Sequence, residues 1–316
     1  MPETNQVLAR LAGREAASLV GVGIDGTARG DKHAALDRII RELKVPNPQE
    51  VYTRLVKHLQ GSELTINFQA YKFFNRKPSG VGYVSQFEGG NRWGGGSYIT
   101  DRDTAEEAMF DYSGTRARPA RVHAEVMDRV RLLGKLAADR FEPSVRPKYA
   151  ALNYARLKYG SAGMWGKSFM VLKEHVKHSA TYLHSDSFDQ IRDPMKRAAL
   201  QTKIATFFDM DRLLVNMPSA MLRALYDAER GKDFGDTTVI DGLNATDYIE
   251  AQVHGEVRFE RDIAKIMISG AEVNEAQART QKLAAAGNFK VVTPKKLRET
   301  FDKFGHKYSI PAAVIK

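Results

Sequence analysis

The segment DYIEAQVHGEVRF, residues 247–259, alternates polar and apolar side chains with a period of two. Successive side chains of a β-strand point to opposite faces. Glu250, Gln252, His254 and Glu256 would therefore line one face, while the apolar residues between them would pack against a core. On a cleft wall, this row of carboxylate, amide and imidazole groups would supply acid–base and hydrogen-bonding chemistry. An ordinary antiparallel strand with one solvated face has the same pattern, and both interpretations stay open.

A second candidate is Arg146, in the run VRPKY. The guanidinium group carries a fixed fork of donors that can clamp a phosphate or a ribose. The alternative is a surface arginine that precedes a proline, since arginine is mostly exposed in proteins.

A third candidate is WGKSFMVLKEHVKHSATY, residues 165–182. Ser168 lies in a Gly-Lys-Ser turn at the start of an apolar run, and Ser179 and Tyr182 follow it. A tyrosine ring can stack on a flat ligand, and a nearby serine can hydrogen-bond an amide. The alternative is that Tyr182 packs in the core.

Other kinds of site are less well supported. The glycine-rich run SQFEGGNRWGGG, residues 85–96, would let backbone N–H groups approach a phosphate, but it matches neither the P-loop nor the dinucleotide-binding fingerprint. The sequence has no HExxH and no GxSxG motif, and its 8 histidines are scattered. It has no cysteine, so disulfides and thiol nucleophiles are excluded. We expect no metal site.

The bulk composition predicts a soluble, folded protein. The chain has 316 residues, of which 43% are hydrophobic and 9% aromatic, enough to build a core. Its net charge of +10 favours an acidic partner, and nucleic acid is a less favoured one. No apolar run is long enough to span a membrane, and residues 1–19 lack the pattern of a secretory signal.

Helical and strand patterns alternate along the chain, which predicts an α+β fold. Residues 1–60 are predicted helical, residues 63–74 and 237–269 have strand character, and residues 192–230 are helical again. Asp103 and Glu106 have capping-box spacing, which predicts a short helix from that point, and residues 120–140 have the pattern of an amphipathic helix. Residues 293–305 predict a basic helix. The predicted organisation is an N-terminal helical segment (1–60), a catalytic domain (61–285) and a C-terminal basic helix and tail (286–316).

The order of several motifs resembles a family of uncharacterised bacterial proteins. These motifs are LTINF, YVSQFEGGNRWGG, RDTAEEAMFDYSG, RPKYAALNY, FMVLKEHV, ATYLHSDS and DYIEAQVHG, and they cover roughly residues 63–269. That family looks related to the ADP-ribosyltransferase superfamily of bacterial toxins and effectors. The run GKSFMVLKEHVKHSATY is also similar to the nicotinamide-binding segment of the poly-ADP-ribose polymerase branch, although Met170 stands where that branch has tyrosine.

The resemblance implies a split β-sandwich core, with N-terminal and inserted helices, that binds NAD as a substrate in a cleft. It implies that Glu250 is the catalytic carboxylate, that Gln252 binds ribose or acceptor, and that Glu256 is the second choice for the catalyst. A carboxylate there would stabilise the positive charge that develops as nicotinamide leaves. Gly255 is expected to distort the strand and turn Glu256 away.

The resemblance also implies a set of NAD-binding residues. Arg146 would fill the superfamily's first motif, which binds ribose and phosphate. If that motif lies in TINFQ instead, Gln69 takes its place. Ser168, with Phe169 beside it, would brace the catalytic glutamate, and Ser179 and Tyr182 would hold nicotinamide. The implied partner is a protein acceptor, with a threonine of host ubiquitin as one candidate, reached after secretion into a host cytoplasm. A catalytically degenerate binding module and a nucleic-acid-binding or nucleic-acid-modifying protein remain alternatives.

Overall fold

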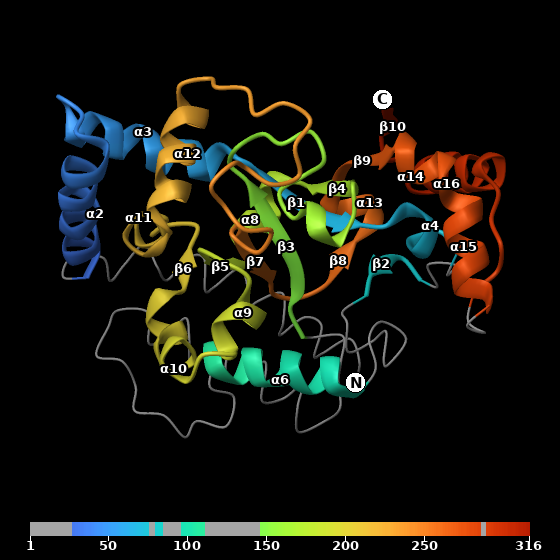
Figure 1. Cartoon of the computed structure of the whole chain (residues 1–316), viewed down its shortest axis with the longest axis horizontal. Helices are drawn as coiled ribbons and strands as arrows, with labels where there is room; N and C mark the ends of the chain where they lie inside the picture. The colour runs from blue at the N-terminus through green and yellow to red at the C-terminus, as the bar shows by residue number, and fades with distance from the viewer. Residues whose placement is uncertain (1–26, 76–79, 85–95, 111–145, 286–288) are drawn as a thin grey trace.

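The computed structural model describes residues 27–75, 80–84, 96–110, 146–285 and 289–316 (Figure 1). Its centre is a sheet of eight strands in the order β10-β9-β4-β1-β3-β7-β5-β6. Strands β9 and β10 are parallel, and the other neighbouring pairs are antiparallel. The strands of this sheet are β1 (Glu63–Phe68), β3 (Lys148–Asn153), β4 (Ser168–Leu172), β5 (Ala180–Leu183), β6 (Ala205–Thr206), β7 (Ile249–Val253), β9 (Ile263–Ser269) and β10 (Ala312–Ile315). Strands β2 (Gly82–Tyr83) and β8 (Val257–Arg258) form a separate antiparallel pair. The predicted α+β class is confirmed.

One face of the sheet lies on the main hydrophobic core. Helices α2 (Thr27–Leu43), α3 (Pro48–Gly61), α11 (Asp211–Asn216) and α12 (Ser219–Glu229) pack against one another beside it. Pro48 occupies the first turn of α3, where its missing N–H costs no hydrogen bond. Val51, Leu55 and Leu59 recur every four residues and are buried, so α3 presents a continuous apolar stripe to the core. The helical pattern predicted before residue 61 is confirmed for the part that the structure describes.

The opposite face, at strands β3, β7 and β5, is covered by a second group of helices. These are α6 (Gly96–Phe110), α9 (Ser187–Ile191) and α10 (Pro194–Lys203), which contact one another (Figure 1). Met109 and Phe110 of α6 are fully buried with Leu183 and Leu200 in a smaller apolar cluster. The capping-box prediction is wrong, because α6 begins at Gly96 and Asp103 therefore lies within the helix.

A third group of helices packs at the β9–β10 end of the sheet. It consists of α4 (Ala70–Phe73), α14 (Gly270–Asn274), α15 (Ala276–Ala285) and α16 (Pro294–Tyr308). The predicted basic helix is α16, and the Thr293 side chain caps it by accepting from the N–H of Lys296. The segment after α16 adds β10 to the main sheet through parallel pairing with β9.

Three short elements complete the described fold: the 3₁₀-turn η3 (Gly163–Trp165) and the helices α8 (Glu174–Lys177) and α13 (Phe259–Asp262). Strand β1 ends at Phe68 and α4 begins at Ala70, so the strand predicted over residues 63–74 is shorter than expected. The predicted helix over residues 120–140 and nearly all of the glycine-rich run lie outside the described residues. None of the helices in the described part is both long and apolar enough to cross a membrane.

Candidate functional site

Strand β7 carries Glu250 and Gln252 on the face of the sheet that α6 covers. Cross-strand partners share a face, and Gln252 lies opposite Tyr149 of β3 and Thr181 of β5. The Gln252 Nε2 donates to Glu250 Oε1 at 2.7 Å, which confirms that the two side chains lie on the same face. This face is not solvated, because Glu250 and Gln252 are 1% and 0% exposed.

The polar row continues from Gln252 to His254. The hydroxyl of Thr181 donates to Gln252 Oε1 at 2.9 Å and lies 2.9 Å from His254 Nε2. Burial, helped by the positive charge of Lys148, lowers the pKa of His254 to about 4. The imidazole is therefore neutral near pH 7, and it extends the hydrogen-bonded row without adding charge.

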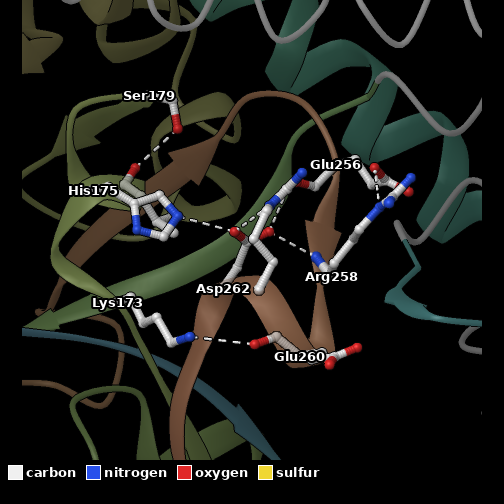
Figure 2. Close-up of polar contacts among 9 residues, drawn as sticks. Lys173, His175, Ser179, Glu256, Arg258, Glu260 and Asp262 are labelled. Carbon is white, nitrogen blue, oxygen red and sulfur yellow. Dashed lines mark hydrogen bonds and ion pairs between the residues drawn. The ribbon is translucent and has the colours of Figure 1, made fainter. Parts of the chain in front are cut away.

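Glu256 leaves this row, as the glycine before it led us to expect. Gly255 has a φ of +91°, in the left-handed region that glycine adopts without strain. Strand β7 has already ended at Val253. The Glu256 carboxylate instead accepts from Arg258 Nε at 2.8 Å (Figure 2).

Figure 2 shows the separate polar cluster to which Glu256 belongs, centred on Asp262. The buried Asp262 carboxylate contacts His175 at 3.0 Å and accepts from Arg261 and from the N–H of Arg258. Burial alone would raise the pKa of Asp262, but these hydrogen bonds outweigh burial and lower it. Ser179 lies at the margin of this cluster and donates its hydroxyl to the carbonyl of Val176 at 3.0 Å.

Arg102 of α6 brings a positive charge to Glu250. Its guanidinium carbon lies 3.7 Å from the ring centroid of Tyr149 and 3.9 Å from that of Phe188, so two aromatic rings hold the group. Arg102 Nη1 donates to Ser187 Oγ at 2.9 Å and lies 3.9 Å from Glu250 Oε2. The carboxylate and the guanidinium are each 2% exposed and attract each other with little screening by water.

Arg146 lies beside this pair and ties α6 to β3. Its Nε donates to Glu106 Oε2 at 2.5 Å and its Nη2 to Asp103 Oδ1 at 2.6 Å. The hydroxyl of Tyr149 donates to Glu106 Oε1 at 2.9 Å. Burial raises the pKa of Glu106 although Arg146 opposes this effect. In this structure the fork of Arg146 donors therefore binds carboxylates of the protein itself.

A second buried carboxylate, Asp186, lies at the start of α9. Its Oδ1 accepts from the N–H of Phe188 at 2.8 Å, which caps the helix. Its Oδ2 accepts from the Tyr248 hydroxyl at 2.7 Å, and that hydroxyl accepts from Trp165 Nε1 at 3.1 Å. The N–H of Ser187, between the two, donates to Glu250 Oε2 at 3.3 Å. Adjacent backbone amides thus hold Asp186 and Glu250.

The surroundings of Glu250 favour its protonated form. Burial, followed by the negative charge of Asp186, raises the pKa of Glu250 to about 7, although Arg102, Ser187 and Gln252 act in the opposite direction. A carboxyl group that titrates near neutral pH can act as either a general acid or a general base. We call Arg102, Glu106, Arg146, Tyr149, Asp186, Tyr248 and Glu250 the carboxylate network.

The structure places Tyr182 on the other face of the sheet. Tyr182 pairs with Ala251, the neighbour of Glu250, so the Tyr182 and Glu250 side chains point in opposite directions. The Tyr182 ring is 0% exposed in the main core, and its hydroxyl donates to the carbonyl of Lys177 at 2.9 Å. A ligand that touches Glu250 does not reach this ring.

The other predicted NAD-binding residues lie at a different part of the sheet. Strand β4 is three positions from β7, so Ser168 is separated from Glu250 by roughly 14 Å across the sheet. Ser168 Oγ donates at 2.7 Å to a different glutamate, Glu272. Phe169 packs in a small apolar cluster, and Gln69 accepts from the hydroxyl of Tyr71 at 2.7 Å. Of the predicted residues, the structure brings together Glu250, Gln252 and Arg146.

Five residues of the network were not predicted as site residues: Arg102, Glu106, Tyr149, Asp186 and Tyr248. All five lie within motifs that the sequence did single out: Arg102 and Glu106 in RDTAEEAMFDYSG, Tyr149 in RPKYAALNY, Asp186 in ATYLHSDS and Tyr248 in DYIEAQVHG. The two α6 residues lie four apart, which places them on one face of a helix. An arginine and a glutamate at that spacing are normally a surface pair, so only the sheet beneath them reveals that they are buried.

A family model described as "Protein of unknown function (DUF3626)" matches residues 80–306, more than two thirds of the chain. The match includes the whole carboxylate network. No curated protein matches the chain.

Proposed function

Because the chain belongs to the DUF3626 family, whose description assigns no activity, we propose a function from the residues of the chain itself. The protein is an NAD-dependent mono-ADP-ribosyltransferase that modifies a protein acceptor, and Glu250 is its catalytic carboxylate. One observation supports this most: Glu250 is buried, its carboxylate is oriented by Gln252, and its pKa is raised to about 7. The proposal includes the finer fold assignment, an ADP-ribosyltransferase-like split β-sandwich within the larger sheet.

Glu250 and Gln252 would have different roles in the transfer of ADP-ribose from NAD to the acceptor. The bond between C1′ of the ribose and the nicotinamide nitrogen breaks, its electron pair leaves with nicotinamide, and positive charge develops on the ribose. An ionised Glu250 stabilises that charge. An acceptor hydroxyl then bonds to C1′ and gives its proton to Glu250. Gln252, whose Oε1 and Nε2 are both engaged, keeps the carboxylate in one orientation.

Substrate access is part of the proposal, because Glu250 is 1% exposed. For NAD to reach the carboxylate, α6 has to move away from the sheet and Arg102 has to leave Ser187 and the two aromatic rings. The guanidinium groups of Arg102 and Arg146 would then be able to bind the diphosphate, whose geometry suits their paired donors. The basic net charge of the chain, +10, also favours an anionic substrate.

A second candidate function is an NAD-binding or protein-binding module without turnover. The closed packing around Glu250 and the core position of Tyr182 favour this candidate, since among the described residues they leave no open nicotinamide site beside the carboxylate. It differs from the transferase in one measurable respect: it does not cleave NAD.

The test is incubation of the purified protein with labelled NAD and a eukaryotic lysate, with ubiquitin as a defined acceptor in a parallel reaction. Wild type should release nicotinamide and label a protein. Glu250→Gln should lower the rate about 100- to 1000-fold while NAD affinity stays within a few-fold. Glu256→Gln is the matched control and should stay active. NAD binding by calorimetry without cleavage would support the module, and the absence of both would reject the proposed function.

A further inference from the structure

Asp186 has no part in the proposed reaction, yet hydrogen bonds to neighbouring backbone amides hold its carboxylate next to that of Glu250. The Asp186 side chain is buried at 2% exposure, next to a Glu250 that is 1% exposed. The two carboxylates accept from consecutive N–H groups, those of Phe188 and Ser187. Since consecutive amides of one helical turn lie side by side, the two negative charges are held close together in a region with little water.

Charges on the surrounding elements do not balance this pair. On α6, Arg102 Nη1 lies 3.9 Å from Glu250 Oε2. Arg146 is already bound to Glu106 and Asp103 of α6. The ammonium group of Lys148 on β3 donates at 3.3 Å to the carbonyl of Arg146 and acts on His254, at the other end of the polar row.

The remaining titratable groups near Glu250 are neutral at pH 7. Burial raises the pKa of the Tyr149 and Tyr248 phenols well above its ordinary value, and burial lowers the pKa of His254. Among the described side chains, Arg102 is therefore the guanidinium that offsets the charge of Glu250, and it acts on Glu106 as well. Two like charges in one buried site cannot both ionise freely, so a proton bound to one of them relieves the repulsion.

Tyr248 and the backbone hold the Asp186 carboxylate next to Glu250. Asp186 accepts short hydrogen bonds at both oxygens, from Tyr248 at 2.7 Å and from the N–H of Phe188 at 2.8 Å. The indole N–H of Trp165 donates to the same hydroxyl, which directs the hydroxyl proton of Tyr248 toward Asp186. Donors of this kind stabilise the charged form of a carboxylate. The backbone hydrogen bond to Glu250 is longer: the N–H of Ser187 donates to Glu250 Oε2 at 3.3 Å.

We propose that Asp186 is a positioning residue for Glu250: its carboxylate, held beside Glu250 by the adjacent N–H groups of Ser187 and Phe188, keeps a proton on Glu250 at neutral pH. The part of this proposal that concerns catalysis rests on the proposed function. The pyridinium ring of NAD is a cation, and a cation close to Glu250 stabilises the ionised form of its carboxyl group. Binding of NAD then releases the Glu250 proton to solvent and leaves the carboxylate charged for the reaction.

The first experiment does not depend on activity. In the full chain with ¹³C-labelled glutamate carboxyl groups, the Glu250 resonance is identified by its absence from Glu250→Gln, and its chemical shift is followed against pH. Asp186→Asn keeps a residue that caps helices well, so α9 is retained. It should move the Glu250 midpoint to lower pH by about one unit or more, within the range for loss of a like charge. Tyr248→Phe, which keeps both carboxylates, should move it less. An unchanged midpoint in Asp186→Asn would overturn the proposal.

The second experiment separates this inference from the proposed function. In wild type, calorimetry in buffers of different ionisation enthalpy should detect proton release when NAD binds, and the acid limb of NAD cleavage should move to lower pH in Asp186→Asn. If cleavage occurs and its acid limb stays in place, Asp186 is not a positioning residue. If the resonance moves but wild type neither binds nor cleaves NAD, the effect of Asp186 on the Glu250 proton stands and the proposed function fails.

Discussion

Replacing Glu250 with glutamine should remove a pH dependence of stability that wild type has. The pKa of Glu250 is raised from 4.5 to about 7, so between these values the folded protein binds a proton that the unfolded chain does not. The free energy of unfolding therefore contains a contribution that is complete below pH 4.5 and is lost as pH rises through 7. At about 1.4 kcal/mol per pH unit, the loss over the roughly 2.5 units of this window is about 3–4 kcal/mol. Glutamine cannot titrate, so the variant should lack this loss.

The assay is urea denaturation of both proteins at about pH 5 and about pH 8, with the unfolding free energy taken from the midpoint and slope. Asp262→Asn is a useful control, since hydrogen bonds lower the pKa of Asp262 despite its burial. Its contribution is present above the unfolded pKa and is lost as pH falls, so this variant should keep the wild-type difference between the two conditions. If wild type and Glu250→Gln lose the same free energy from pH 5 to pH 8, the buried, like-charged environment assigned to Glu250 is wrong.

Three further predictions follow from the same contacts. Tyr182→Phe should lower the free energy of unfolding by about 1 kcal/mol, because it removes one buried hydrogen bond. NAD affinity should not change, and a large loss of affinity would place the Tyr182 ring in the ligand site. Gly166→Ala should lower the free energy of unfolding, measured in denaturant, by about 3 kcal/mol or more. The φ of Gly166 is +148°, and an added Cβ would lie 2.1 Å from the carbonyl oxygen of Phe68. A mild effect would mean that this turn can move to make room. Arg146→Met should cost about 3–5 kcal/mol, because it removes the guanidinium that binds the buried Glu106 carboxylate most closely. Asp103→Asn should cost less than about 1 kcal/mol, because the Asp103 side chain is 61% exposed; thermal unfolding that ranks the two variants in reverse would contradict the assigned ion pairs.

The local part of the site could be predicted from the sequence. The period-two alternation placed Glu250 and Gln252 on one face, because strand geometry alone fixes that relation. The effect of Gly255 on Glu256 was predictable for a similar reason, since glycine supplies the left-handed conformation that ends the strand's regular course. Each of these features depends on residues only a few positions apart.

The rest of the site depends on pairing between distant segments. Tyr182 and Glu250 each fit a functional pattern, but the register Tyr182↔Ala251 decides that they face opposite ways, and a shift by one residue would reverse this. Arg102 approaches Glu250 only because α6 crosses the sheet 148 positions earlier in the chain. No local spacing encodes that approach, so the cation next to Glu250 could not be identified from the sequence.

The pairing of β1 with β3 has a consequence for how the family can vary in length. These strands lie side by side near the centre of the sheet, although residues 69–147 separate them. The entropy of closing a flexible loop changes only with the logarithm of its length, so twenty extra residues in this connection would cost about 0.2 kcal/mol. A comparable insertion into a two-residue hairpin would disrupt the strand register. We therefore expect members of the family to differ most in length between residue 80, where the match begins, and β3, on either side of α6, because Arg102 and Glu106 of that helix must still reach the sheet.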